Sequence, residues 1–277
     1  MRLDDTGKVS FDHIYTEPDP RAYFRTLRHL EYQIPGLATP HFRALIDEYR
    51  SANRVDTPQV VDLGSSYGIN AALLRCDATM AELYERYGDA APDSTEELLA
   101  ADRDLVASRP GTRARFVGLD VSEPALAYAI KAGFLDDAVC ADLESADLTD
   151  EQRRQLAGTN LLISTGCLGY VGVPTISRIV NAATRAPWMA HFVLRMFPFD
   201  PIADALADLG YRTVQIDGLF RQRRFGSAQE QEQVLDNLAA VGVDPTGHET
   251  EGWFYARLFV CRPAVGSNPT NRGEGAQ

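Results

Sequence analysis

Three loops that each follow an apolar run carry the residues best suited to form a ligand site. The first is residues 62–68 (DLGSSYG), which separates an apolar run from a helical one. Small residues let a backbone approach a ligand closely, and free N–H groups at a helix start favour a negative group. Asp120 ends the next apolar run and Asp142 ends the third. Each feature alone suits a turn or a helix cap, but three in succession predict a ligand site.

The acids in these loops suggest which chemical groups they bind. A carboxylate at the end of a strand can accept hydrogen bonds from both hydroxyls of a ribose, which suits Asp120. Asp142 is placed to receive an adenine amino group, with Leu143 against the ring. Asp62, immediately before the glycine loop, can meet a charged amino group. The acids at positions 120 and 142 thus suit the ribose and the adenine of one ligand.

The elements that must position these loops alternate between strand and helix patterns. Short apolar runs predict seven strands, at residues 59–63, 116–119, 138–141, 160–164, 189–196, 212–216 and 253–261. Helices are predicted at about 20–30, 40–50, 69–74, 124–132, 175–184, 202–209 and 228–240. Alternation of this kind implies a mostly parallel, doubly wound α/β sheet covered on both faces. Ligands of such sheets bind beyond the carboxyl ends of the strands, where the three loops lie.

These motifs resemble those of the class I S-adenosylmethionine-dependent methyltransferases, over roughly residues 55–262. Residues 60–68 look like the family's first motif, with Ser66 in place of the middle glycine, and residues 118–122 (GLDVS) look like its ribose motif. Residues 140–144 (CADLE) resemble the adenine motif, and residues 160–172 match the fourth motif, which faces the acceptor. The resemblance implies seven strands with the last antiparallel, and S-adenosyl-L-methionine as cofactor. The expected cofactor-binding residues are Asp62, Gly64, Ser65, Ser66, Tyr67, Gly68, Asn70, Asp120, Val121, Asp142, Leu143 and Thr165.

A nicotinamide dinucleotide is the rival cofactor, because it also needs a glycine-rich turn and a ribose acid. Its fingerprint is G-x-G-x-x-G with the acid ~20 residues further on. Here the loop has only Gly64 and Gly68, and the acid lies at position 120. The spacing therefore favours the methyltransferase interpretation over an oxidoreductase.

The chain divides into a cap, a catalytic domain and a tail. We expect an N-terminal helical cap segment at 1–54, a methyltransferase domain at 55–263 and a disordered tail at 264–277. Two amphipathic helices are predicted in an insertion after the first motif helix, at 77–112. A structural or dimerisation role for this insertion is favoured over a catalytic one, which leaves a homodimer open. A second long excursion, at 217–252, is either a lid over the acceptor pocket or a solvated basic turn.

The acceptor is predicted to be a small molecule with an oxygen nucleophile. Residues 164–170 lack the Pro-Pro loop of enzymes that methylate DNA bases and the acid of catechol-type enzymes, and the paired-glutamate loop of protein-arginine enzymes is also missing. Arg21, Arg25 and Arg28 share a helix face and repel one another unless the acidic body or an anionic substrate answers them. The expected substrate-binding residues are Tyr15, Tyr23, Arg25, Cys167, Tyr170, Arg221 and Arg224.

A carboxylate acceptor is the preferred prediction because it is already ionised at neutral pH and needs no base. Arginines such as Arg221 and Arg224 would hold it through forked donors. If the acceptor is instead a hydroxyl or an amine, His248 is the first candidate base and His191 the second. A different class of function is also open, in which a non-catalytic protein keeps the cofactor fold as a binding platform.

Charge and cysteine content limit the remaining classes. The formal charge is −12, which disfavours a nucleic-acid partner. Residues 77–112 hold nine acids against three arginines, a net of −6, so half of that charge belongs to the insertion. No apolar stretch reaches the ~18–20 residues of a membrane helix, and the start of the chain lacks a signal-peptide core. Four cysteines without a CxxC pair argue against a metal site. We therefore expect a cytoplasmic protein without a membrane partner.

Overall fold

One seven-stranded sheet forms the centre of the computed structural model, which describes residues 3–4 and 6–264. The strands are β1 (Gln59–Leu63), β2 (Arg115–Asp120), β3 (Asp137–Cys140), β4 (Thr159–Thr165), β5 (Trp188–Leu194), β6 (Tyr211–Arg224) and β7 (Trp253–Pro263). Their order in the sheet is β3-β2-β1-β4-β5-β7-β6. Strands β1 to β5 pair in parallel, and β7 is antiparallel to both β5 and β6. The predicted α/β fold, with seven strands and an antiparallel last strand, is confirmed.

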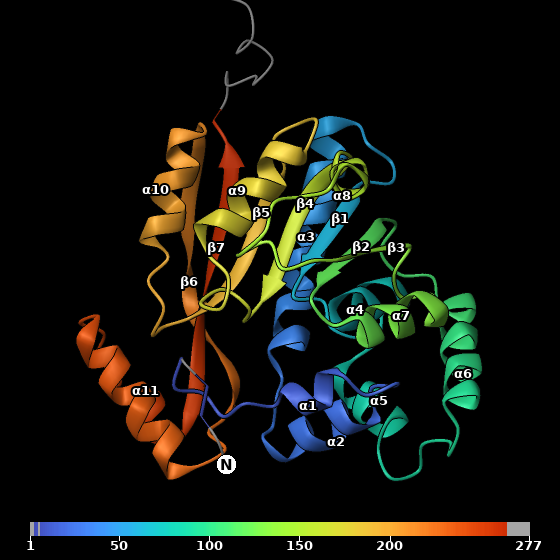
Figure 1. The fold of residues 1–277 in the computed structure, drawn as a ribbon, viewed down its shortest axis with the longest axis horizontal. Helices are drawn as coiled ribbons and strands as arrows, with labels where there is room; N and C mark the ends of the chain where they lie inside the picture. The colour runs from blue at the N-terminus through green and yellow to red at the C-terminus, as the bar shows by residue number, and fades with distance from the viewer. Residues whose placement is uncertain (1–2, 5, 265–277) are drawn as a thin grey trace, which may run out of the picture.

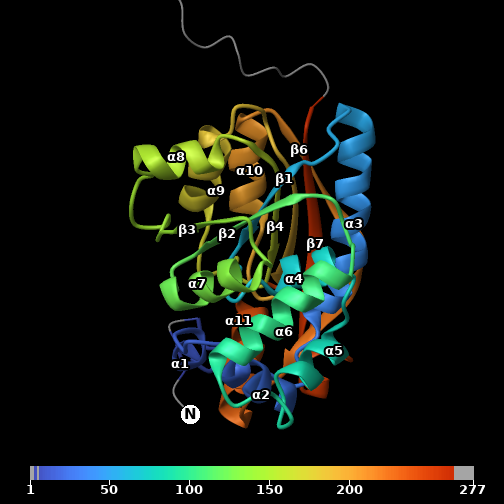
Figure 2. The ribbon, with the colours of Figure 1, turned by 90° about the vertical axis from the view of Figure 1, so that its right-hand side faces the viewer.

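Helices cover both faces of this sheet (Figure 2). One face carries α8 (Asp150–Leu156), α9 (Val173–Ala182) and α10 (Asp200–Asp208), and the opposite face carries α3 (Ile34–Asn53) and α4 (Ile69–Cys76). The helix α7 (Glu123–Ala132) follows β2. In Figure 1, α1 (Asp12–Tyr15), α2 (Arg21–His29) and α11 (Ala228–Ala240) all lie at the lower end of the molecule, to which β6 and β7 also extend. Within the described part of the chain, no helix has the length and apolarity needed to cross a bilayer.

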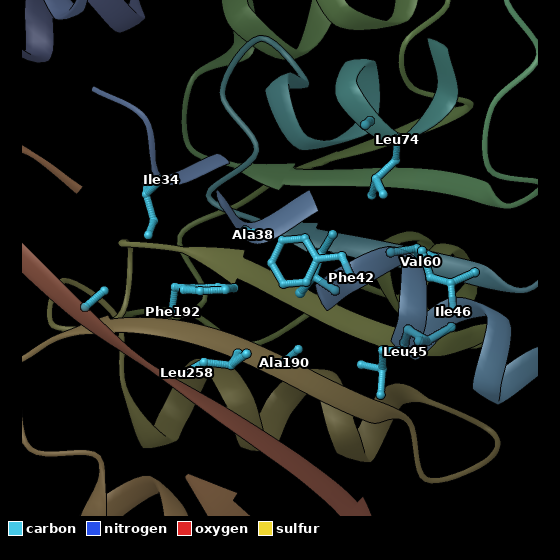
Figure 3. Close-up of a cluster of buried hydrophobic side chains, with 14 of the residues drawn as sticks. Ile34, Ala38, Phe42, Leu45, Ile46, Val60, Leu74, Ala190, Phe192 and Leu258 are labelled. Atoms are coloured by element: carbon cyan, nitrogen blue, oxygen red, sulfur yellow. The ribbon is translucent and has the colours of Figure 1, made fainter. Parts of the chain in front are cut away.

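The core between α3 and the sheet explains why α3 is longer than predicted. Phe42 of α3 packs edge-on against Phe192 of β5, with ring centroids 5.6 Å apart, and Figure 3 shows further side chains of α3, β1 and β7 around them. The sequence predicted a helix start at Pro40, but the helix begins at Ile34 and Pro40 lies inside it. An interior proline costs about 3 kcal/mol. Burial of Ile34, Phe42 and Ile46 along one face offsets that cost, because each large apolar side chain contributes ~1.5–3 kcal/mol.

Strand β6 is also longer than predicted, running on past residue 216 to Arg224. Its pairing with β7 shifts register between Ile216 and Phe220 and again between Arg221 and Arg224. Gly218 takes a φ of +106° at the first shift. These bulges break the alternation by which a strand is identified, so the predicted 217–252 excursion begins with strand rather than loop. The helix predicted at 228–240 is present as α11.

The insertion forms the two helices expected of it, α5 (Met80–Arg86) and α6 (Thr95–Ser108). Thr79 and Glu82 make a capping box at the start of α5. Asp102 of α6 is fully buried and accepts hydrogen bonds from the hydroxyls of Tyr87 (2.8 Å) and Tyr128 (2.7 Å). These bonds join the insertion to α7. The insertion also packs on α2, where the ring of Tyr87 stacks on that of Phe24 with centroids 4.6 Å apart. The predicted tail at 264–277 lies, apart from residue 264, outside the described residues.

Candidate functional site

A cavity of about 640 Å³ opens where β1, β2 and β4 end. This volume is within the range of small-molecule sites. Its walls come from the N-terminal segment, α2, the glycine loop, the β4 exit and the end of β6. From the predicted cofactor set the cavity is lined by Gly64, Ser65, Ser66, Asn70, Asp120, Val121 and Thr165. From the predicted substrate set it is lined by Tyr15, Tyr23, Cys167 and Tyr170.

The glycine loop that forms one wall is held in an unusual backbone conformation. Gly64, Ser66 and Gly68 all have positive φ, at +72°, +48° and +74°. For Ser66 this left-handed region costs roughly 1–2 kcal/mol, which is backbone strain of the kind found at ligand sites. The Gly64 N–H donates to the Leu119 carbonyl at 2.8 Å, which fixes the loop against the end of β2.

Position 64 has no room for a side chain, and a matched pair of variants measures the cost of adding one. A Cβ on Gly64 would lie 2.7 Å from Cβ of Cys167, whereas one on Gly242, whose φ is +69°, would have nothing within 4 Å. Both alanine variants incur the left-handed backbone cost. Only Gly64→Ala adds overpacking, which costs about 1–3 kcal/mol. We expect urea unfolding to give a larger loss of stability for Gly64→Ala than for Gly242→Ala, and equal losses would contradict a packing role for Gly64.

Asp62 is a fully buried acid beneath this loop. Its Oδ1 accepts a hydrogen bond from Nδ2 of Asn70 at 3.0 Å, and the same Nδ2 lies 3.2 Å from Oγ1 of Thr165. Its Oδ2 has no hydrogen-bond partner among the described residues. Burial, with a smaller contribution from the charge of Asp120, raises the pKa of Asp62 to about 7. The hydrogen bond from Asn70 opposes this shift. This carboxyl is therefore poised to ionise when a cation binds beside it.

Three more buried polar atoms of the same wall have no partner among the residues described: Ser65 Oγ, Ser66 Oγ and Asn70 Oδ1. Leaving a buried polar group without a hydrogen bond costs about 1–3 kcal/mol. Native structures contain few such groups, and a cluster of them around a cavity indicates a site for a polar ligand.

Asp120 faces this wall from the end of β2. One of its oxygens accepts from the N–H of Ser66 at 2.8 Å, and the other accepts from the N–H of Ser122 at 2.9 Å. Each carboxylate oxygen has two acceptor sites, so both can still accept from the hydroxyls of a ligand. The neighbouring Val121 side chain is 69% exposed and offers an apolar surface beside them.

Five of the predicted cofactor residues are not among the described residues that line the cavity: Asp62, beneath the glycine loop, and the four that follow. Asp142 is exposed at the end of β3 and accepts from the N–H of Glu144 at 3.0 Å, closing its own turn. Leu143 is buried in the core on the α8–α10 face. The Tyr67 hydroxyl lies 3.0 and 2.8 Å from the carbonyls of Ile14 and Glu17, where it holds the N-terminal segment. Gly68 precedes the first residue of α4.

The arginine stripe of α2 points away from the cavity, including Arg25, a predicted substrate residue. Arg25 donates to the Gly88 carbonyl at 3.1 Å, and Arg21 donates to the carbonyls of Pro92 and Asp93 at 2.9 and 2.8 Å. Arg28 reaches the Tyr84 carbonyl at 3.5 Å. Arg21 also forms an ion pair with Asp19 at 2.7 Å. Backbone carbonyls of the insertion and an acid of the protein itself therefore neutralise these charges, which is one of the two alternatives that the sequence left open.

Arg221, Arg224 and His248 are not among the described residues that line the cavity. Arg221 lies over the Trp253 ring at 4.9 Å and donates to the Tyr255 hydroxyl at 3.1 Å. Arg224 lies over the same ring and forms an ion pair with Glu31. His248 is half-buried, with Nδ1 2.9 Å from the Thr246 carbonyl. The structure does not bring the two predicted arginines or the predicted base to the cavity.

His191, the second candidate base, is a core residue. It is fully buried in β5, and its Nδ1 lies 2.8 Å from Oγ of Ser164. Burial lowers its pKa to about 3, so the ring stays neutral. Burial likewise raises the pKa of the Cys167 thiol to about 12, which leaves that thiol protonated and unreactive as a nucleophile.

The cavity is also lined by residues that the sequence did not single out as ligand contacts, among them Lys8, Tyr32 and Gln222. Lys8 and Gln222 are buried, and Oε1 of Gln222 has no partner in the described structure. A sequence signal existed only for Lys8, which is one of two lysines among 27 basic residues. Across the described residues, no group of three His, Cys, Asp or Glu side chains is arranged to hold a metal ion.

Comparisons with known proteins give distant structural neighbours. No family model and no curated protein matches the sequence. Magnesium protoporphyrin IX methyltransferase (ChlM) from Synechocystis PCC 6803, solved with bound SAM, is 12% identical at a TM-score of 0.39, over 79% of this chain and 76% of that one. The plantazolicin methyltransferase BamL, in complex with a triazolic desmethylPZN analogue and SAH, is 10% identical at a TM-score of 0.42, over 83% of this chain and 86% of that one. The [4+2]-cyclase SpnF is 13% identical at 0.37, over 80% and 81%. Similarities this weak carry no information about the ligand or reaction of this chain.

Proposed function

We propose that the chain is an S-adenosylmethionine-dependent methyltransferase acting on the oxygen of a small-molecule carboxylate. The observation that carries this proposal is the pair Asp62 and Asp120. They stand at the ends of adjacent parallel strands, with the strained loop and its partnerless polar atoms between them. The resemblance of residues 60–68 and 118–122 to the family motifs supports the same assignment.

The residues present fit the parts of this cofactor. Asp62 lies beneath the glycine loop, outside the described lining of the cavity, and its Oδ2, which has no partner among the described residues, suits the ammonium of the methionine half. Asp120 lines the cavity and retains acceptor capacity for two ribose hydroxyls. The exposed Val121 side chain suits the face of an adenine ring. When bound, S-adenosylmethionine supplies a methyl group that passes to the acceptor oxygen and leaves S-adenosylhomocysteine. The task of the chain is to orient the acceptor and exclude water.

A carboxylate suits this cavity better than a hydroxyl or an amine. Those acceptors must lose a proton to a base. No histidine occurs among the described residues that line the cavity, where the groups able to accept a proton are Asp4, Asp120 and Lys8. Burial raises the pKa of Tyr23 and of Tyr32, so both phenols stay protonated and act as donors. A carboxylate arrives ionised and needs only alignment.

Binding of S-adenosylhomocysteine tests the cofactor assignment. Calorimetry is expected to show saturable binding of S-adenosylhomocysteine and no binding of NADH. Absence of S-adenosylhomocysteine binding would contradict the proposal. A screen of small acids and phenols with methyl-labelled S-adenosylmethionine then identifies the product. Binding without any labelled product would favour the alternative of a non-catalytic binding protein.

Asp120→Ala is expected to weaken S-adenosylhomocysteine binding about 10- to 100-fold. Hydrogen bonds to charged groups contribute ~1.5–3 kcal/mol, and each 1.4 kcal/mol is tenfold in affinity. Asp142→Ala is the matched control, because Asp142 is exposed and closes only its own turn. Calorimetry on both variants measures how much each acid contributes to S-adenosylhomocysteine affinity. An unchanged affinity in Asp120→Ala would mean that Asp120 does not bind the ribose.

A further inference from the structure

Lys8 is a buried cation at the edge of the cavity. Its side chain lines the cavity, and the residue is only 7% exposed. The ammonium lies 4.8 Å from the centroid of the Tyr170 ring and 5.9 Å from that of Phe254. Among the described residues it forms no ion pair and no hydrogen bond. Buried charges are normally paired, because removing one from water costs several kcal/mol, so an unpaired one marks a place for an anion.

The neighbouring charges are already engaged with other partners. Both terminal nitrogens of Arg223 donate to the Glu230 carboxylate, at 2.7 and 3.0 Å. Asp4 accepts from the Tyr170 hydroxyl at 2.7 Å and from Thr6 Oγ1 at 2.7 Å. Neither acid lies within ion-pair distance of the Lys8 ammonium, so its charge remains available to a ligand.

Lys8 lies on the opposite side of β4 from the predicted cofactor residues. The rings beneath it belong to Tyr170, which follows β4, and to Phe254 near the start of β7. Asp62 and Asp120 belong to β1 and β2, and β4 separates those strands from β5, β7 and β6. This arrangement assigns Lys8 to the acceptor end of the cavity.

Between the two ends the wall is aromatic. Tyr23 packs edge-on against Tyr15 and Tyr32, at 5.6 and 6.2 Å between centroids. Phe11 and Leu27 line the same cavity. A wall of rings and aliphatic carbons binds an apolar, planar ligand body.

We propose that Lys8 binds the carboxylate of the acceptor while these rings hold its body, so that the substrate class is an aromatic or similarly flat, apolar carboxylic acid. This inference rests on the methyl-transfer function proposed above. It replaces Arg25, Arg221 and Arg224 by Lys8 as the residue that recognises the negative group.

The acid–base behaviour of Lys8 provides the readout. Burial, with a smaller contribution from the charge of Arg223, lowers its pKa to about 8, while Asp4, Glu230 and Cys167 oppose that shift. A bound carboxylate within about 4–6 Å favours the charged ammonium and raises the pKa, typically by one unit or more. The midpoint of the Lys8 titration therefore reports directly whether an anion binds there.

The experiment uses the full chain with isotope-labelled lysine, which gives only two side-chain signals by NMR, Lys8 and the exposed Lys131. The pH titration is recorded with saturating S-adenosylhomocysteine, alone and with benzoate, hexanoate, benzamide or phenol. We expect benzoate to raise the Lys8 midpoint by about one unit or more. Benzamide is expected to leave it in place, and the Lys131 midpoint should not move.

Three results would overturn the inference. The first is a Lys8 midpoint that neither carboxylate raises. The second is a rise of the same size with S-adenosylhomocysteine alone, which would assign Lys8 to the cofactor carboxylate. The third is a response to phenol but not to benzoate, which would make Lys8 a base. Failure of S-adenosylhomocysteine to bind would count against the proposed function, while titration with benzoate alone would still test the anion site.

Variants supply an independent measurement. Lys8→Met keeps the length of the side chain and removes its charge, so benzoate affinity should fall at least tenfold, as expected when a charge-assisted contact is lost. Lys8→Arg, which keeps the positive charge, should retain part of the affinity for benzoate. Affinity for S-adenosylhomocysteine should stay within about twofold, and Lys131→Met is the matched control. A tenfold loss of S-adenosylhomocysteine affinity in Lys8→Met would contradict the assignment to the acceptor.

Discussion

Asp62→Asn is expected to reduce S-adenosylhomocysteine affinity at pH 8 by about 30-fold or more. Truncating one partner of a buried, hydrogen-bonded charge pair costs 2–5 kcal/mol or more, and each 1.4 kcal/mol is tenfold. Asparagine has the same shape, removes the negative charge and replaces one acceptor oxygen by an NH2 donor. Asp62 is fully buried and its Oδ2 has no partner in the described part of the chain, so no solvent replaces the lost interaction. Calorimetry on the wild type and the variant measures the difference.

The same carboxyl should make wild-type affinity depend on pH. Its pKa is raised to about 7 by burial, with Asn70 opposing the shift and Asp120 adding to it. A bound ammonium requires the ionised form, so below pH 7 binding must release a proton and affinity should fall by up to about tenfold per pH unit. Affinity should therefore rise from pH 6 to pH 8 in the wild type and stay flat in Asp62→Asn. Calorimetry in buffers of different ionisation enthalpy counts the released proton.

Asp62→Asn should have the opposite effect on stability, which it is expected to raise while it weakens binding. A carboxyl whose folded-state pKa is raised above its unfolded value stabilises the fold while it is protonated, and that stabilisation is lost between about pH 4 and pH 7. Above pH 7 the free energy of unfolding of Asp62→Asn should therefore exceed that of the wild type, by a few kcal/mol. Asp142→Asn, at an exposed position, should show no such gain. Weaker binding without a gain in stability at pH 8 would show that ionised Asp62 is not destabilising in the free protein.

The half of the cavity nearest β1 and β2 could be predicted from the sequence, for a geometric reason. Parallel strands end at the same edge of a sheet, so acids that follow two apolar runs must lie near one another. Asp62 and Asp120 were located in this way. The method places a backbone position but not a side chain, and Asp142 stands at its strand end while its carboxylate turns back to Glu144 and Ser145.

In the other half of the cavity the sequence predicted four lining residues, Tyr15, Tyr23, Cys167 and Tyr170, but not the charged ones. Those charged side chains are placed by contacts distant in the sequence. The partner of Arg25 is a carbonyl 63 residues away. No local sequence pattern distinguishes this carbonyl from an anionic ligand, because either can accept hydrogen bonds from the arginines of one helix face. Lys8 sits in a short polar segment without periodicity, and only the fold brings it over Tyr170 and Phe254.

Glu230 illustrates how a local signal conceals a long-range contact. Ser227 and Glu230 have the spacing of a capping box, and the Ser227 hydroxyl does accept from the Glu230 N–H at 3.1 Å. The Glu230 carboxylate, however, accepts from Arg223 of β6 and from the N–H of Val9, at 2.6 Å for the latter. One fully buried acid thus connects α11, the sheet and the segment that carries Lys8.

Glu230→Ala is accordingly expected to be strongly destabilising, by about 3–5 kcal/mol. Removing one partner of a buried ion pair leaves an uncompensated charge, here Arg223, whose side chain is also buried. The Val9 N–H loses its acceptor as well. For a chain of this size each kcal/mol corresponds to roughly 2–4 °C, so the melting temperature should fall by on the order of 10 °C. Thermal and urea unfolding measure both quantities.

Glu232→Ala is the matched control, because Glu232 lies on the same helix but is exposed. Its stability should stay within about 0.5 kcal/mol of the wild type. The double variant Arg223→Met/Glu230→Leu removes both charges at similar volume and should recover much of the lost stability. It cannot restore the acceptor of the Val9 N–H, so benzoate should still bind it more weakly than the wild type. If Glu230→Ala unfolds like Glu232→Ala, the buried pair does not hold the N-terminal segment in place.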